Sequence, residues 1–292
     1  VGEQGTLGVY IFFIITGFVI PLSLAKSDFR ISQIHRFLSK RWNRIEMPYL
    51  ISIVLILSLS FVFSIKNNTP FDFDAIRLSQ HLFYSATFFG YEWYNPIFWT
   101  LAIEMQFYIL IAFLYPLLKV NNQLVLIIIP LVLGMSTLLV DDIRFVFHFG
   151  SIFSQGILLY LILTNKLGKL IGASGIILCA IITFYGNGIG IAVISLLTVG
   201  TIAFTNTNTK LFNWLGNISY SLYLIHGLIG GSLIYLFGRY ANDSFTKTII
   251  VLAALAASLV AAYVYWKIIE QPSKKWSKKI TISYETQAAL KS

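Results

Sequence analysis

Nine runs of mainly apolar residues occupy most of this sequence. They cover residues 7–24, 47–65, 97–118, 124–140, 145–163, 170–184, 189–204, 214–237 and 248–267. An α-helix needs about 20 apolar residues to cross a bilayer, and the apolar pattern is continuous rather than alternating, which argues against β-barrel strands. Only 11% of the residues are charged, too few for the surface of a soluble domain. We therefore predict an all-α, polytopic transmembrane helical bundle of about nine spans.

Lysine and arginine are distributed unevenly among the connections. If the connection after the first run lies in the cytoplasm and the sides alternate, sixteen Lys and Arg residues fall inside and five outside. This bias predicts a multi-pass cell-membrane protein with a cytoplasmic C-terminus. It accounts for the net charge of +9 without a nucleic-acid partner. The longest connection, 66–96, then faces outward, and we expect its middle, 76–89, to lie along the outer interface.

Ionisable residues inside the predicted spans are the first candidates for chemistry, because a charge is costly to bury in lipid. Glu104 lies in the third run, and Thr100, Glu104 and Tyr108 recur every four residues, so they share one helix face. Both a functional carboxylate and a structural one bound by a tyrosine or arginine stay open. His226 shares a face with Tyr223 in the eighth run, where a functional histidine and an ordinary buried one stay equally open.

The densest basic segment, 36–44, reads RFLSKRWNR. Arg41 and Arg44 are three residues apart and would lie on one side of a helix, where guanidinium groups match phosphate oxygens. Composition alone favours a simpler interpretation, a positive-inside anchor with affinity for anionic lipid. The single cysteine, Cys179, excludes an intrachain disulfide, and the sequence has no zinc-type spacing of Cys and His. We therefore expect no metal and no bound cofactor.

Five stretches, taken together and in order, resemble motifs of the membrane-bound acyltransferase 3 family. They are GTLGVYIFFIITGFVI (5–20), RWNR (41–44), FWTLAIEMQFYIL (98–110), LGNISYSLYLIHGLI (215–229) and IEQPSKKW (269–276). The resemblance implies that Arg41 and Arg44 bind acyl-CoA and that Glu104 acts in catalysis. It also implies a set of cavity-lining residues: Trp99, Gln106, Tyr108, Tyr220, Tyr223 and His226.

The sequence departs from the family pattern at Tyr10, Thr16 and Met105, where aspartate, serine and glutamate are common. Members of the family have ten core helices, and the first carries an arginine and a histidine thought to act in catalysis. The resemblance implies that Glu104 orients this histidine. Nothing here corresponds to that first helix. We therefore expect residues 1–292 to be a single acyltransferase domain that is truncated at its N-terminus.

The resemblance implies an O-acyltransferase of a bacterial inner membrane. Its co-substrate would be cytoplasmic acyl-CoA, with acetyl as the expected acyl group. The acceptor would be a hydroxyl of a carbohydrate or lipid-linked glycan, such as exopolysaccharide or lipopolysaccharide. Two other classes stay open. A transporter or flippase of glycan intermediates often shows internal repeats and broken spans, which we do not find. A sensor or scaffold would tolerate substitution of Glu104 and Arg44.

Overall fold

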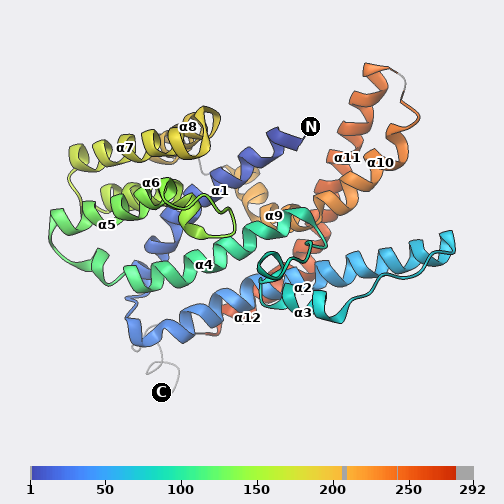
Figure 1. Ribbon diagram of the computed structural model, residues 1–292, viewed down its shortest axis with the longest axis horizontal. Helices are drawn as coiled ribbons and strands as arrows, with labels where there is room; N and C mark the ends of the chain where they lie inside the picture. Colours follow the sequence, from blue (N-terminus) through green and yellow to red (C-terminus); the bar gives the residue numbers. More distant parts are fainter. Residues whose placement is uncertain (1, 206–208, 242, 281–292) are drawn as a thin grey trace. The chain divides into compact units, whose positions relative to one another are not determined.

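The protein is helical in a computed structural model that describes residues 2–205, 209–241 and 243–280 (Figure 1). Helix makes up 83% of the structure, and no strand occurs in those ranges, so the all-α prediction is confirmed. The α-helices are α1 (Gly2–Lys26), α2 (Ile34–Asn67), α3 (Ala75–Leu82), α4 (Trp99–Leu114), α5 (Gln123–Met135), α6 (Gly150–Leu163), α7 (Lys169–Asn187), α8 (Ile189–Phe204), α9 (Lys210–His226), α10 (Ser232–Gly238), α11 (Ser244–Tyr265) and α12 (Gln271–Lys278). Two π-helical turns join the last four: η7 (Gly227–Gly231) and η8 (Trp266–Glu270).

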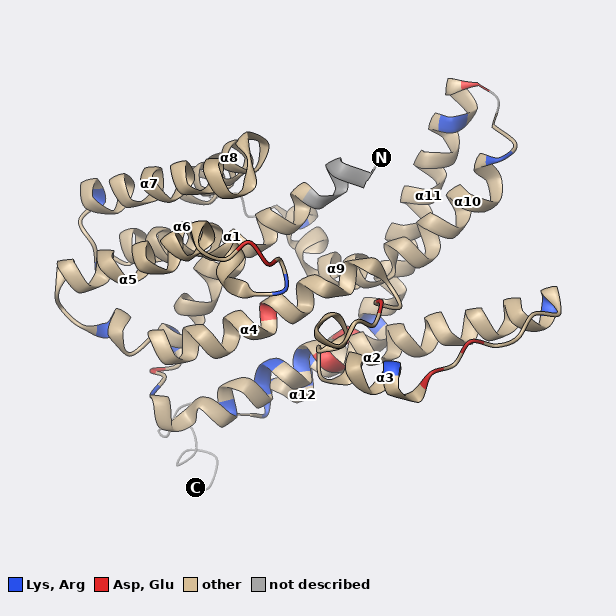
Figure 2. Cartoon of the chain, viewed as in Figure 1, with Lys and Arg blue, Asp and Glu red and all other residues tan. Residues whose placement is uncertain are grey.

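Seven helical segments in the described part of the chain are long and apolar enough to cross a membrane. Two more apolar helices, Gln123–Leu138 and Ile189–Phe204, are shorter. Each of the nine predicted runs therefore corresponds to an apolar helix, although two of them fall short of about 20 residues. The chain is a multi-pass membrane protein, and its few charged side chains interrupt long uncharged stretches (Figure 2).

Polar residues of the connections determine where several helices begin. Asp74 accepts hydrogen bonds from two backbone N–H groups at the start of α3, and Asn122 does the same for α5. Thr209 and Asp243 each accept one at the starts of α9 and α11. These side chains replace acceptors that the first turn of a helix lacks. Short polar segments between the apolar runs thus define the helix boundaries.

The chain divides into two compact groups of residues. The first group contains residues 2–35 and 99–205 of the described chain, and the second contains 36–98, 209–241 and 243–280. The single domain predicted over 1–292 stays a prediction. It includes residues 281–292, and thus Lys291 of the charge count, which lie outside the described residues.

Helices α1 and α6 of the first group cross at backbone contact. A Cβ atom on Gly17 would lie 2.4 Å from the carbonyl oxygen of Phe153, and one on Gly156 would lie 2.2 Å from that of Ile14. Small residues allow such an approach between membrane helices, which gain packing contacts from it. Phe107 of α4 stacks on Phe153 beside the crossing, with ring centroids 4.1 Å apart. The GTLGVYIFFIITGFVI stretch therefore has a packing role at Gly17.

Helix α11 of the second group packs through one row of small residues. Ala254, Ser258 and Ala262 are buried, and a Cβ atom on Gly230 of η7 would lie 2.7 Å from Ser258 Oγ. Leu255, next to this row, stays exposed and apolar, as a side chain facing lipid would be. The small residues of the last span, which recur every four residues, thus allow close helix packing.

The connection between α2 and α4 returns along α2. Tyr84 stacks on Tyr49 with ring centroids 5.1 Å apart, and the Tyr49 hydroxyl donates to the carbonyl of His81. Position 49 lies 18 residues before the end of α2 at Asn67, or about 27 Å along the helix axis. We expected the segment 76–89 to lie along the outer interface. The segment packs on α2 and Phe83 remains 76% exposed, while its position at the outer interface stays a prediction.

Candidate functional site

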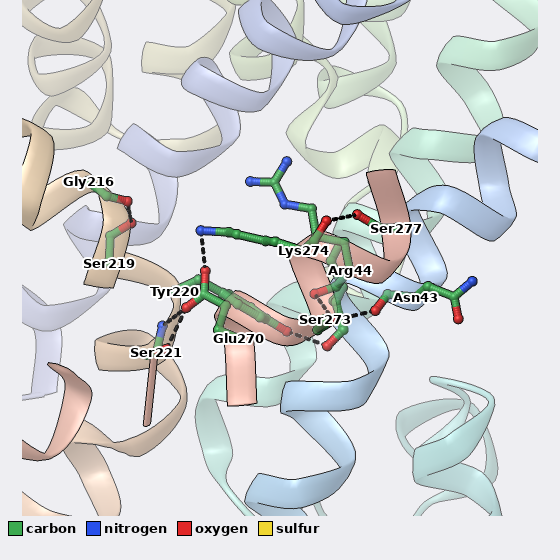
Figure 3. Close-up of polar contacts among 11 residues, drawn as sticks. Asn43, Arg44, Gly216, Ser219, Tyr220, Ser221, Glu270, Ser273, Lys274 and Ser277 are labelled. Atoms are coloured by element: carbon green, nitrogen blue, oxygen red, sulfur yellow. Dashed lines mark hydrogen bonds and ion pairs between the residues drawn. The ribbon is translucent and has the colours of Figure 1, made fainter. Parts of the chain in front are cut away.

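A proline inside α2 creates an unusual backbone segment next to the predicted phosphate-binding arginines. Pro48 has no N–H, so the carbonyl of Arg44, four residues earlier, loses its helical donor. Ser273 of α12 compensates: its hydroxyl donates to the carbonyl of Asn43 at 2.5 Å and to that of Arg44 at 3.3 Å (Figure 3). The proline thus leaves the Arg44 carbonyl as an acceptor for α12.

Two tyrosines complete the docking of this part of α2. The Tyr220 hydroxyl of α9 donates to the carbonyl of Ile45 at 2.9 Å, and the Tyr265 hydroxyl of α11 donates to the carbonyl of Pro48. Three helices therefore hold one stretch of α2 through its carbonyl oxygens. Tyr220, predicted to line a cavity, here has a positioning role.

The two arginines of the RWNR stretch differ in exposure. Arg41 is 9% exposed and its guanidinium lies 5.7 Å from the Phe37 ring centroid, whereas Arg44 is exposed. Lys40 lies within electrostatic range of both arginines and of Lys278 on α12. Lys and Arg gather along the first half of α2, beside α12 (Figure 2). The structure thus presents a basic region to which α12 contributes.

A buried carboxylate anchors the start of α12. Glu270 is fully buried, and one of its oxygens accepts hydrogen bonds from the backbone N–H and the hydroxyl of Ser221, at 3.1 and 2.5 Å. Its other oxygen lies 2.5 Å from Lys274 Nζ (Figure 3). A buried carboxylate needs such partners, because removing it from water is costly. The IEQPSKKW stretch therefore joins α9 to α12.

Glu46 is a second buried acid that sequence analysis missed. It is 4% exposed, and one carboxylate oxygen accepts a hydrogen bond from the Tyr84 hydroxyl at 2.7 Å. The other oxygen is buried without a hydrogen-bond partner among the described residues. The apolar pattern begins the second span at residue 47, which leaves Glu46 in the polar connection. An acid two residues after Arg44 and next to an apolar run was the available signal.

The predicted polar stripe on α4 lies in the first group. Thr100, Glu104 and Tyr108 are all buried, and the Tyr108 hydroxyl donates a hydrogen bond to Glu104. The shared face that their spacing predicts is therefore present. The structural interpretation of Glu104 requires such a bond to a tyrosine. The bond orients the carboxylate whether its role is structural or catalytic. Its catalytic role stays a prediction.

Trp99 and Gln106 of α4 make packing contacts. The centroid of the Trp99 ring lies 6.4 Å from that of Phe13 and 5.7 Å from that of Phe149. The Gln106 amide accepts a hydrogen bond from the backbone N–H of Val146 at 2.9 Å and donates one to the carbonyl of Arg144 at 2.8 Å. Both side chains hold the segment before α6 against α4. Their predicted cavity-lining role stays a prediction.

Tyr223 and His226 line a groove of about 720 Å³ in the second group, formed by α9, η7, α10 and α11. The His226 Nδ1 atom lies 3.0 Å from the carbonyl of Leu222 and 2.9 Å from that of Tyr223. Both partners are acceptors, so Nδ1 is the donor in these contacts. The Tyr223 hydroxyl donates to the carbonyl of Ile97, away from this histidine. Within the described ranges, no three His, Cys, Asp or Glu residues could hold a metal ion.

The comparison with protein families decides which kind of protein this is. A model described as an acyltransferase domain, that of the acyltransferase 3 family, matches residues 3–267. The chain belongs to the acyltransferase 3 family. No curated protein and no solved structure matches it.

The resemblance found in the sequence is thereby confirmed, and three of its five stretches meet in the second group. In this acyltransferase 3 protein, RWNR of α2, LGNISYSLYLIHGLI of α9 and η7, and IEQPSKKW of η8 and α12 are joined through Ser273, Tyr220 and Glu270. Contacts between stretches far apart in the sequence thus position the two arginines. The site roles assigned from the family stay predictions.

Proposed function

We propose that this membrane acyltransferase uses acyl-CoA as its acyl donor and binds it through the phosphate groups of coenzyme A. The observation that carries the proposal is the basic region of α2 and α12, in which Arg44 is exposed and its backbone is held by Ser273. Guanidinium groups on a fixed backbone suit the diphosphate of coenzyme A, because the planar fork matches phosphate oxygens. Arg41, more deeply buried, would form the inner edge of this site.

The proposed reaction is O-acylation of a carbohydrate or a lipid-linked glycan, with acetyl as the expected group. The acceptor hydroxyl oxygen attacks the thioester carbonyl carbon, the carbon–sulfur bond breaks, and the hydroxyl proton ends on the sulfur of coenzyme A. A base must take that proton in the transition state. The proposed role of Glu104 is to orient this base through its carboxylate, whose own orientation Tyr108 supports.

The proposed location is a bacterial inner membrane with the C-terminus in the cytoplasm. The excess of Lys and Arg in alternate connections supports this orientation. It would place the first half of α2 and α12 on the side where acyl-CoA occurs. The connection between α2 and α4, with exposed aromatic side chains such as Phe83 and Phe89, is the proposed acceptor-binding element.

The test is a mass spectrum of cell-surface glycans from cells with and without the intact gene. Mild alkali releases ester-linked acyl groups and distinguishes them from amides. Loss of an alkali-labile acyl mass on one sugar would support the proposal and identify the acceptor. Unchanged acylation with less total glycan would favour a flippase instead. No change in acylation or glycan amount would contradict both functions. Purified protein that includes the family's first helix should also move a radiolabelled acetyl group from acetyl-CoA, and Arg44→Gln should raise the KM for acetyl-CoA.

A further inference from the structure

Helix α12 presents two adjacent rows of side chains to the basic region. Ser273 and Ser277, four residues apart, form a buried row at 2% and 3% exposure, and Ser273 of this row contacts α2. Lys274 and Lys278 form the neighbouring row, at the same spacing. Because Ser273 binds the carbonyls of Asn43 and Arg44, this lysine row is held beside the arginine segment. The docking thus adds cations to those of α2.

The basic region carries more positive than negative charge. Glu270 is already neutralised by Lys274, with Nζ and Oε1 2.5 Å apart. Lys40 and Lys278 have no ion-pair partner in the part of the chain that the structure describes, and neither has Arg44. Lys40 is only partly exposed, yet it lies within range of three like charges. Repulsion at such a site disfavours the arrangement unless an anion is bound.

We infer that α12 belongs to the donor site and that Lys278, together with Lys40, binds the ribose monophosphate of coenzyme A. The inference rests on the proposed function, in which Arg41 and Arg44 take the diphosphate. Two arginines on one helix turn present paired forks, which suit the linked phosphates of a diphosphate. Lys40 of α2 and Lys278 of α12 then form a second pair, which is available to bind a separate phosphate. Lysine suits a terminal monophosphate because its ammonium is a compact charge on a flexible stem.

The experiment compares binding of CoA and dephospho-CoA, which lacks the ribose monophosphate, to the full chain in phosphatidylcholine nanodiscs. Wild-type protein should bind CoA about tenfold more tightly, the effect of one charge-assisted phosphate contact. Lys278→Gln should abolish this preference by weakening CoA alone. Lys275→Gln is the matched control. It removes the same charge from an exposed position of α12 outside both rows and should retain the preference.

The remaining outcomes separate this inference from the proposed function. If wild-type protein binds neither ligand, the proposed donor is wrong. If it binds both and Lys278→Gln weakens them equally or not at all, the assignment of Lys278 is overturned while acyl-CoA stays the donor. A lipid headgroup is the other source of phosphate. If Lys278→Gln keeps the preference for CoA but loses stabilisation by phosphatidylglycerol nanodiscs, α12 binds lipid and the inference fails.

Discussion

Tyr84 and Glu46, 38 residues apart in the sequence, share a hydrogen bond of 2.7 Å in a buried part of the second group. The bond joins the returning connection to α2 just beyond the RWNR stretch. Tyr49 supports it by stacking on the Tyr84 ring. One hydroxyl therefore links the proposed acceptor-binding segment to the helix that carries the proposed donor site.

Replacing Tyr84 with phenylalanine should destabilise the protein. The substitution leaves the buried carboxyl group of Glu46 without its donor, which costs about 1–3 kcal/mol of unfolding free energy. Thermal unfolding in detergent micelles measures the effect, and Tyr235→Phe, at an 81% exposed position, is the control. The double variant Glu46→Leu with Tyr84→Phe should be more stable than Tyr84→Phe alone. Equal stability of Tyr84→Phe and Tyr235→Phe would contradict the proposed importance of this bond.

Ser273→Ala should destabilise the docking of α12 by about 1 kcal/mol, because the carbonyl of Arg44 then has neither a helical nor a side-chain donor. Pro48→Ala restores the missing N–H to that carbonyl. The cost of Ser273→Ala should therefore be smaller in a Pro48→Ala background. A double-mutant cycle of unfolding free energies measures the coupling. Full additivity would show that Ser273 does not compensate for the proline.

Gly17→Ala should weaken the crossing of α1 and α6. The new Cβ would lie 2.4 Å from a backbone oxygen of Phe153, so a helix must shift, at a cost of about 1–3 kcal/mol. Gly8→Ala is the matched control in the same helix, since nothing lies within 4 Å of its Cβ position. The expected result is a lower unfolding temperature for Gly17→Ala only. Similar temperatures for both variants would argue against backbone contact at this crossing.

Stability should fall as the pH falls through the range of histidine titration. Burial lowers the pKa of His81, in α3, below its ordinary value of about 6.5. Nδ1 of its ring lies 2.8 Å from the carbonyl of Arg77, and Nε2 accepts the N–H of Tyr94, so protonation of Nε2 would break the second bond. The native state thus binds fewer protons than the unfolded state, and its stability rises with pH up to about 6.5. Unfolding temperatures from pH 5 to 8 measure this slope.

His81→Gln is the comparison for that series. It removes the titrating ring, so the slope between pH 5 and 6.5 should become smaller even if the variant is less stable at every pH. A slope that stays the same in His81→Gln would assign the pH dependence to other groups.

Glu104→Gln should lower turnover and leave the affinity for CoA unchanged, if Glu104 orients the base of the reaction. The amide keeps the size of the side chain and an acceptor for the Tyr108 hydroxyl, but it removes the negative charge. A loss of about 10²-fold or more in kcat fits the contribution of an oriented acid–base group. Acetyl transfer and CoA binding are measured on the same preparation of protein that includes the family's first helix, which carries the predicted base. Unchanged turnover would leave Glu104 with a structural role.

Sequence alone was sufficient for the class of protein, because hydrophobic length and charge bias act locally and are visible residue by residue. The spacing of Thr100, Glu104 and Tyr108 likewise predicted their shared face, since helical periodicity needs no tertiary information. The family resemblance of the RWNR stretch predicts an anion site, whereas composition alone favours a simple anchor. These inferences concern single helices.

Only the tertiary structure decided which helices meet and therefore what the polar residues do. Nothing in the sequence pairs Ser273 with Arg44, Ser221 with Glu270 or Tyr84 with Glu46, since each bond joins segments at least 38 residues apart. The Arg44 carbonyl, which Pro48 leaves without a helical donor, is satisfied by the side chain that packing brings near. Burial of Glu46 likewise depends on the return of a connection that its composition placed at the interface. Long-range packing determines these contacts, and the local periodicity of the sequence does not show which segments pack together.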